Sequence, residues 1–263
     1  MIVDIEQVLK QKNILYHSNQ GIKVCSVQES DALDLALAIL YAATDPKTAL
    51  YLSGGKTPKE LYKRLATEEL LMPGAVLQVD ERFGPPYHAN SNQKMMRETG
   101  LLRYFEMRDI PFYPMLQLPS SLRAGEADDD LRKKTAELYD EKIRSLNATF
   151  QKSVAVLGIG ADGHTAGLPA QSSKLKMQNS KLNNKYDLVT EYIDTSGKYG
   201  ERVTMTFVGL SMMDVLLVLV FGADKKEALE QMFQSGSEQE IPARFYKRPE
   251  IARKTILITD QAI

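Results

Sequence analysis

The chain has 263 residues, of which 43% are hydrophobic, and a net charge of −1. This length and apolar content predict a globular fold with a substantial core, and the near-neutral charge gives no electrostatic basis for binding nucleic acid or an anionic membrane. One cysteine, Cys25, excludes an internal disulfide, and residues 1–10 lack the apolar core of a signal peptide, so we expect a cytoplasmic protein.

Strand and helix patterns alternate through the first half of the chain. Residues 22–27 predict a strand, and we expect Ser30 and Asp31 to cap the helix that follows. Pro58 suits the first turn of a second helix. The other elements expected here are strands at 49–52 and 76–79, the latter ending at Asp80-Glu81-Arg82, a helix at 93–105, an irregular stretch at 111–121, and a long charged helix at 126–146.

The second half continues the alternation. The most apolar stretch, residues 215–221, is far shorter than the ~20 residues that a membrane span needs, so it predicts a buried strand. Strands alternating with helices predict a doubly wound, mainly parallel sheet, and we expect a single domain over residues 1–263. The other expected elements are strands at 154–157, 188–193, 202–207 and 255–258, and a helix at 225–233.

The segment from Val154 to Leu168 contains the most informative pattern. Four apolar residues predict a buried strand, and a glycine-rich turn follows with Asp162 and His164 two positions apart. Three interpretations remain open. Gly158, Gly160 and Gly163 fit a dinucleotide fingerprint, but no long helix is expected after them. The turn could also hold an incidental histidine, or a catalytic histidine that a carboxylate orients.

The segment Ser53-Gly54-Gly55-Lys56-Thr57 joins a strand to a helix. Such a loop directs backbone N–H groups and the positive end of a helix toward an anion. It resembles a P-loop only in its last residues, because the required earlier glycine is Leu50. A phosphate cradle and a capped turn therefore remain about equally supported.

Several other predicted strands end in polar residues. Asp80 and Arg82 follow one strand, and Lys225 follows another; Arg202 is a further candidate cation. In a parallel sheet such ends share one edge, where ligands bind, although each residue alone could be an ordinary surface charge. His17 and His88 lack metal-ligand spacing to His164, so we expect no metal, and no G-x-S-x-G elbow is present.

Four segments, in order along the chain, carry a resemblance to a known family. They are Ser53-Gly54-Gly55-Lys56-Thr57-Pro58; Asp80-Glu81-Arg82 with Pro86, His88, Ser91 and Asn92; Gly158-Ile159-Gly160-Ala161-Asp162-Gly163-His164-Thr165-Ala166; and Arg202-Val203-Thr204 with Gly222-Ala223-Asp224-Lys225. On these residues the chain resembles the 6-phosphogluconolactonases, within the glucosamine-6-phosphate isomerase/lactonase superfamily.

The resemblance implies a three-layer α/β/α Rossmann-like sandwich and hydrolysis of 6-phospho-D-glucono-1,5-lactone in the oxidative pentose phosphate pathway. His164 would be the general base that activates water, with Asp162 as its orienting partner, and no cofactor or metal would be required. The residues implied in binding the phosphate and the rest of the substrate are Ser53, Gly54, Gly55, Lys56, Thr57, Asp80, Arg82, Arg202 and Lys225.

Two alternatives remain beside hydrolysis. Isomerase and deaminase relatives carry a glutamate soon after the histidine, whereas residues 165–170 contain no acid, which argues against that branch. The other alternative is a non-catalytic sugar-phosphate-binding protein. We expect a phosphorylated sugar lactone as the partner, no nucleic acid or membrane, and a monomer or weak homodimer.

Overall fold

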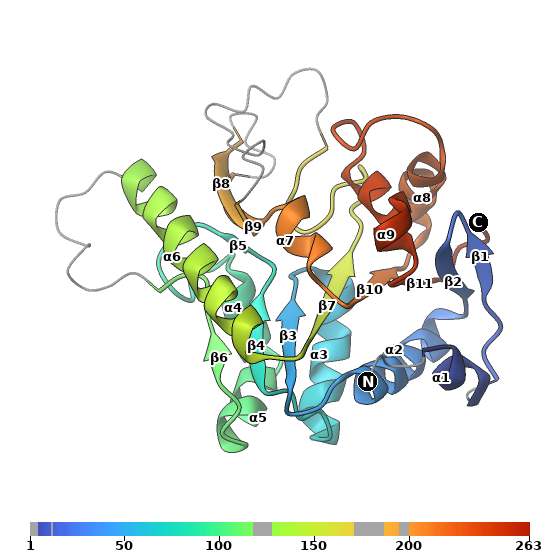
Figure 1. Ribbon diagram of the computed structural model, residues 1–263, viewed down its shortest axis with the longest axis horizontal. Coiled ribbons are helices and arrows are strands. Elements are labelled where there is room, and N and C mark those ends of the chain that lie inside the picture. Colours follow the sequence, from blue (N-terminus) through green and yellow to red (C-terminus); the bar gives the residue numbers. More distant parts are fainter. Residues whose placement is uncertain (1–4, 12, 118–127, 171–186, 195–199) are drawn as a thin grey trace.

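The computed structural model describes residues 5–11, 13–117, 128–170, 187–194 and 200–263 (Figure 1). The described residues form an eight-stranded sheet in which all neighbouring strands are parallel except β1 and β2. In spatial order its strands are β1 (His17–Asn19), β2 (Ile22–Ser26), β11 (Thr255–Thr259), β10 (Val215–Val220), β7 (Lys152–Gly158), β3 (Thr48–Leu52), β4 (Ala75–Gln78) and β6 (Phe112–Tyr113).

Helices cover both faces of this sheet, because alternate residues of each central strand are buried on opposite sides. In β3, Leu50 and Leu52 belong to one hydrophobic cluster, and Ala49 and Tyr51 to another. The expected three-layer α/β/α sandwich is confirmed. The first cluster includes residues of α1 (Ile5–Gln11), α2 (Glu29–Ala43), α3 (Lys56–Glu68), α4 (Asn92–Glu98) and α5 (Leu101–Met107); the second includes residues of α6 (Asp128–Thr149), α7 (Phe207–Ser211), α8 (Lys226–Phe233), η4 (Pro242–Lys247) and α9 (Pro249–Ala252).

The order of the strands reverses between β3 and β7. These two strands are neighbours, but the chain leaves β3 for β4 on one side and later leaves β7 for β10 on the other side. Ligands of open α/β sheets bind in the crevice at such a switch point, beyond the carboxyl ends of the strands. Residues 53–57 and 158–164 follow these two ends, so the topology brings two of the predicted segments to one place.

The sequence predicted that residues 80–82 end the strand at 76–79. They instead form a separate strand in a second sheet. The last bond to β3 is Val79 N–H to the Leu52 carbonyl, and the Val79 carbonyl accepts from Met205 N–H, each at 2.9 Å. Pairing thereby passes from one sheet to the other. The second sheet lies on the side toward which the arrows of β3 and β7 point (Figure 1), and its antiparallel strands are β5 (Asp80–Arg82), β9 (Glu201–Met205) and β8 (Val189–Ile193).

The boundaries of two expected helices and one expected strand also differ from the expectation. The helix expected over 93–105 is broken into α4 and α5, because Gly100 adopts a left-handed conformation with φ of 85°. Thr206 ends the strand at 202–207 early by capping α7 through its hydroxyl, which accepts from Gly209 N–H. Helix α2 begins at Glu29 with Gln28 as its N-cap, so Ser30 and Asp31 are not the caps.

Further elements had no clear sequence pattern. Part of the stretch expected to be irregular pairs as β6, while residues 118–127, which include the expected start of the long helix, lie outside the described residues. The elements α1, β1, α7, η4 and α9 were not predicted, and η3 (Ala223–Lys225) precedes α8. Among the described residues, no helix has both the length and the apolar character needed to cross a membrane.

Glu81 lies at the junction of the two sheets with none of its surface exposed. Its carboxylate accepts hydrogen bonds from the backbone N–H groups of Arg82, Asn92 and Gln93 at 2.7, 2.7 and 2.8 Å, and from Gln78 Nε2 at 2.8 Å. Burial raises the pKa of Glu81, and these four donors oppose that rise. One buried side chain therefore joins β4, β5 and the start of α4.

Glu81→Gln is expected to lower the free energy of unfolding by about 2–4 kcal/mol, because an amide would direct N–H groups at buried N–H donors and leave them unsatisfied. Urea denaturation measures this loss. Glu60→Gln removes a carboxylate from an exposed pair on α3 and is the matched control, with an expected change below about 1 kcal/mol. Equal losses in the two variants would contradict this role of Glu81.

Candidate active site

The predicted acid and histidine lie together in the loop after β7. Gly163 N–H donates to the Gly160 carbonyl and Gly160 N–H donates to the His164 carbonyl, both at 2.9 Å, so the loop closes tightly. His164 Nδ1 lies 2.5 Å from Asp162 Oδ1, and that oxygen also accepts from His164 N–H at 3.2 Å. The side chain of His164 is 37% exposed, so solvent reaches the imidazole.

The hydrogen bond to Asp162 fixes which ring nitrogen of neutral His164 carries the proton. An ionised carboxylate can only accept, so the proton resides on Nδ1, and Nε2 keeps the lone pair. The lone pair on Nε2 can therefore accept a proton. No helix begins within residues 159–170, so the dinucleotide interpretation of the glycine pattern is wrong.

Side chains from distant elements hold this loop in place. Thr165 Oγ1 donates to the Gly158 carbonyl at 2.8 Å, and a hydroxyl has one proton, so Tyr246 Oη is the donor in their 2.6 Å contact. Tyr192 Oη donates to the Gly167 carbonyl at 2.6 Å, and Thr204 Oγ1 donates to the Ala166 carbonyl. Tyr246 and Tyr192 were not predicted as part of the site, because no local pattern in the sequence links them to the loop.

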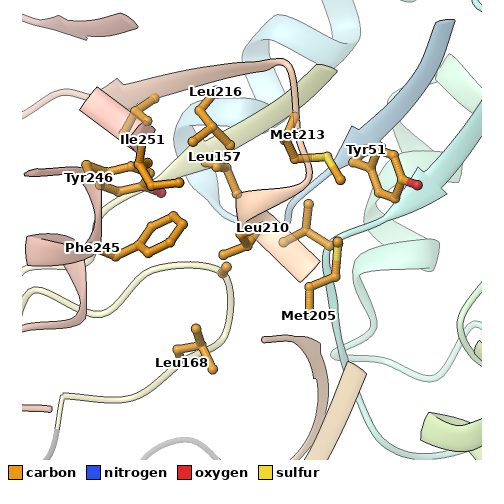
Figure 2. Close-up of a cluster of buried hydrophobic side chains, with 14 of the residues drawn as sticks. Tyr51, Leu157, Leu168, Met205, Leu210, Met213, Leu216, Phe245, Tyr246 and Ile251 are labelled. Carbon is orange, nitrogen blue, oxygen red and sulfur yellow. The ribbon is translucent and has the colours of Figure 1, made fainter. Parts of the chain in front are cut away.

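The loop also ends in the hydrophobic core. Leu168 is 3% exposed and belongs to the cluster that includes Leu157, Leu210 and Phe245, as Figure 2 shows for their side chains. The hydrogen bonds to its carbonyls and the packing of Leu168 in the core together restrict the conformation of the loop. A side chain held in one orientation needs no further ordering when a ligand binds beside it.

Two glycines are required by close approach of side chains. A Cβ on Gly160 would overlap the His164 ring, and a Cβ on Gly54 would overlap the side-chain amide of Asn92. Asn92 Nδ2 in turn donates to the backbone carbonyl of Asp80 at 2.9 Å. The loop at residues 53–57 therefore lies against the start of β5, as the shared edge predicted, with Asn92 between them.

The start of α3 presents backbone donors at the switch point. Gly55 precedes the helix with φ of 118°, and the first turn of any helix leaves N–H groups without intrahelical acceptors. The Ser53 backbone is fixed, since its N–H donates to the Val156 carbonyl and its carbonyl accepts from Tyr62 Oη. The buried Ser53 hydroxyl has no hydrogen-bond partner among the described residues. This segment, with Lys56 and Thr57, fits an anion.

Two arginines lie opposite each other on the second sheet. Arg82 of β5 pairs with Arg202 of β9, so both side chains lie on one face of the sheet. Thr204 and Tyr192 share that face by register, and they contact the loop containing His164. Arg82 Nε and Arg202 Nη1 are buried without a hydrogen-bond partner in the described part of the chain. Facing like charges with buried unpaired donors are unfavourable unless an anion joins them.

Asp80 and Lys225 occupy the remaining predicted positions. Asp80 is 8% exposed, and its Cβ lies 2.8 Å from where a Cβ of Gly167 would be, so it borders the histidine loop. Lys225 Nζ lies 2.9 Å from Asp224 Oδ2. The hydrogen bond from Lys225, and more weakly the charge of Lys56, hold the pKa of Asp224 below its usual value. The positive charges of Lys225 and Lys56, which come from different elements, therefore both influence the Asp224 carboxylate.

The donor set does not resemble a metal site. Within the described residues, no three histidine, cysteine or carboxylate side chains are grouped so that they could bind a metal ion. The site combines one oriented histidine with an adjacent group of cationic and N–H donors. Such a site can take a proton from water beside a bound anionic ligand.

A family model matches residues 28–256 and is described as "Glucosamine-6-phosphate isomerases/6-phosphogluconolactonase". Curated relatives include a 6-phosphogluconolactonase from Rhizobium meliloti (strain 1021), which is 31% identical over 211 residues, covering 80% of this chain and 82% of the relative. Another from Synechocystis sp. (strain ATCC 27184 / PCC 6803 / Kazusa) is 31% identical over 208 residues, covering 74% and 75%.

Solved structures share the fold. The 6-phosphogluconolactonase from Trypanosoma cruzi superposes with a TM-score of 0.68 at 22% identity, covering 93% of this chain and 96% of that one. A 6-phosphogluconolactonase from Thermotoga maritima superposes with a TM-score of 0.63 at 25% identity, covering 90% and 98%. The overall fold is therefore shared with proteins whose sequences are mostly different.

Gly160→Ala is expected to displace the His164 ring, since the added Cβ would overlap it. The downfield NMR resonance of the hydrogen-bonded Nδ1 proton of His164 should then be lost while the remaining spectrum is largely preserved. Gly158→Ala is the matched control, because its Cβ would come no closer than 3.5 Å to a neighbouring atom. If Gly160→Ala retained the resonance unchanged, the ring would not depend on this space.

Proposed function

The chain belongs to the glucosamine-6-phosphate isomerase/6-phosphogluconolactonase family, and from this premise we propose that it hydrolyses 6-phospho-D-glucono-1,5-lactone to 6-phospho-D-gluconate. The observation that carries the proposal is the His164–Asp162 pair, held at the switch point beside a group of unpaired cationic donors. Hydrolysis of a lactone requires an activated water molecule, and binding of its phosphate requires cationic or N–H hydrogen-bond donors.

His164 is the general base in this proposal. Nε2 takes a proton from water as the water oxygen attacks the lactone carbonyl carbon, which forms a tetrahedral intermediate. The intermediate collapses by breaking the bond to the ring oxygen, and the imidazolium returns the proton to that oxygen, which becomes a hydroxyl. The carboxylic acid formed then ionises and releases one proton. Asp162 keeps the ring oriented and stabilises its transient positive charge.

The phosphate is held away from the reacting carbon. Arg82 and Arg202 offer guanidinium donors, and Ser53 to Thr57 offers a hydroxyl and the N–H groups at the start of α3. Lys56 and Lys225 add positive charge. Binding at this end orients the lactone ring against His164, so the binding energy of a non-reacting group lowers the barrier. Asp80, beside Gly167, contacts the sugar.

The loop after the histidine favours hydrolysis over isomerisation. Ring opening and proton shuttling in an aldose–ketose isomerase require an acid placed near the histidine. Residues 165–170 contain none. Their backbone carbonyls accept from Tyr192 and Thr204, and Tyr246 contacts the Thr165 hydroxyl. Both curated relatives described above are named 6-phosphogluconolactonase.

His164→Ala is expected to lower kcat by about 10²- to 10⁴-fold, the usual contribution of a general base. Proton release from freshly generated lactone, with spontaneous hydrolysis subtracted, measures the rate. His17→Ala, at an exposed position of β1, is the control and should retain full activity. A folded His164→Ala variant with wild-type rate would exclude His164 as the base, and ammonia release from glucosamine 6-phosphate would instead support a deaminase.

Arg202→Met is expected to raise KM for the phosphorylated lactone by about 10- to 100-fold, the loss of one or two charge-assisted hydrogen bonds, with a smaller effect on kcat. The same assay with unphosphorylated glucono-1,5-lactone should show little difference from wild type. Arg103→Met, at an exposed position of α5, controls for loss of a positive charge. An equal loss on both lactones would rule out phosphate binding by Arg202.

A further inference from the structure

His88 lies in the loop after β5, outside the residues that carry the proposed reaction. Its Nε2 is 2.9 Å from the Arg82 carbonyl oxygen, and its Nδ1 is 3.4 Å from Asn90 N. The Asn90 carbonyl accepts from Arg82 Nη1 at 2.6 Å. These three contacts form a closed cycle of hydrogen bonds that begins at the Arg82 backbone and ends at the Arg82 guanidinium.

The chemistry of the partners fixes the state of His88. A backbone N–H can only donate, so Nδ1 must accept from Asn90, and a carbonyl oxygen can only accept, so Nε2 must carry the proton. One neutral tautomer satisfies both contacts. A second proton would place an N–H on Nδ1 facing the N–H of Asn90 and would break this cycle of hydrogen bonds.

Packing holds the His88 ring where these bonds form. A Cβ on Gly84 would come within 3.1 Å of His88 Cδ2, so the imidazole lies close against the backbone of Gly84. Tyr87 adopts a left-handed conformation with φ of 60°, which is unusual for an aromatic residue, and the Arg97 guanidinium lies 4.9 Å from its ring centroid. The backbone of the loop is therefore constrained on both sides of the hydrogen-bonded ring.

The cycle of hydrogen bonds through His88 and Asn90 orients Arg82. The hydrogen bond from Nη1 to Asn90 restricts rotation of the planar guanidinium, and the buried Nε has no hydrogen-bond partner among the described residues. Opposite it, Arg202 likewise has a buried unpaired donor. A preorganised arginine binds more tightly than a mobile one, because less rotamer entropy is lost on binding.

We propose that His88 is a positioning residue that sets the guanidinium of Arg82 for the phosphate of the substrate, an inference that rests on the proposed function. His88 touches neither the lactone nor the phosphate. Its contribution therefore passes entirely through Arg82 and concerns only substrates with a phosphate. This coupling separates positioning from a general structural role.

His88→Phe keeps a ring against Gly84 but removes both nitrogens. It is expected to lower the ratio of kcat/KM for 6-phosphogluconolactone over unphosphorylated glucono-1,5-lactone by about tenfold, and to weaken binding of 6-phosphogluconate in titration calorimetry by a similar factor. Arg82→Met should lower both quantities by at least as much. In the Arg82→Met background, His88→Phe should change neither by more than about twofold.

His17→Phe at the exposed site on β1 is the matched control, and thermal unfolding of each variant reports folding. If His88→Phe does not fold, His88→Gln can retain the donor to the Arg82 carbonyl and should give a smaller loss in the same direction. Equal factors from His88→Phe with and without Arg82 would overturn the proposal, as would an unchanged selectivity ratio.

The binding measurement distinguishes this proposal from the proposed function, because 6-phosphogluconate binds without turnover. Wild type that binds 6-phosphogluconate but hydrolyses no lactone would reject the function, and the loss of binding in His88→Phe would still support the positioning role. Wild type that hydrolyses lactone while His88→Phe binds and discriminates normally would reject only the positioning role. Failure of wild type to bind 6-phosphogluconate would reject both.

Discussion

The buried carboxylate of Glu81 is the interaction on which the site depends most. A charge with no exposed surface is tolerated because four N–H donors replace the water that it has lost. Those donors come from Gln78, from Arg82 and from the start of α4. The carboxylate therefore determines where the first sheet ends and where the second begins. It also places Asn92 against Gly54, so that two loops far apart in the sequence become neighbours.

Charged groups are sorted between the two faces of the small sheet. On the face toward α6, Arg132 is 5% exposed and pairs with Glu191 and Glu201, each at 2.6 Å. On the other face, by register, lie Arg82 and Arg202, beside the loop containing His164. Because Arg132 engages the nearby carboxylates, they do not neutralise the two arginines. The alternation of side chains along a strand thus places Arg82, Arg202 and Asp80 on one face and a structural ion-pair network on the other.

The histidine loop illustrates how rigidity is built from distant parts. Residues 158–168 have no regular secondary structure beyond isolated bridges, yet their carbonyls accept from Tyr192, Thr204 and Thr165, and Leu168 packs into the core (Figure 2). In the proposed mechanism this loop has to expose the imidazole of His164 to water and still hold it in one orientation. Here Asp162 orients the exposed imidazole, side chains from β8 and β9 bind the loop backbone, and Tyr246 of η4 contacts the Thr165 hydroxyl.

The sequence by itself determined the parallel strands, the doubly wound arrangement and the adjacent Asp162 and His164, because apolar runs and glycine turns are local signals. The ordered motifs also indicated the family and its substrate. Only the tertiary structure decided that residues 80–82 form a strand of a second sheet, that Arg82 faces Arg202, and that Tyr246 and Tyr192 hold the histidine loop. These features depend on pairing register and on contacts between residues far apart in the chain, and no local pattern of polarity or spacing encodes which partners meet.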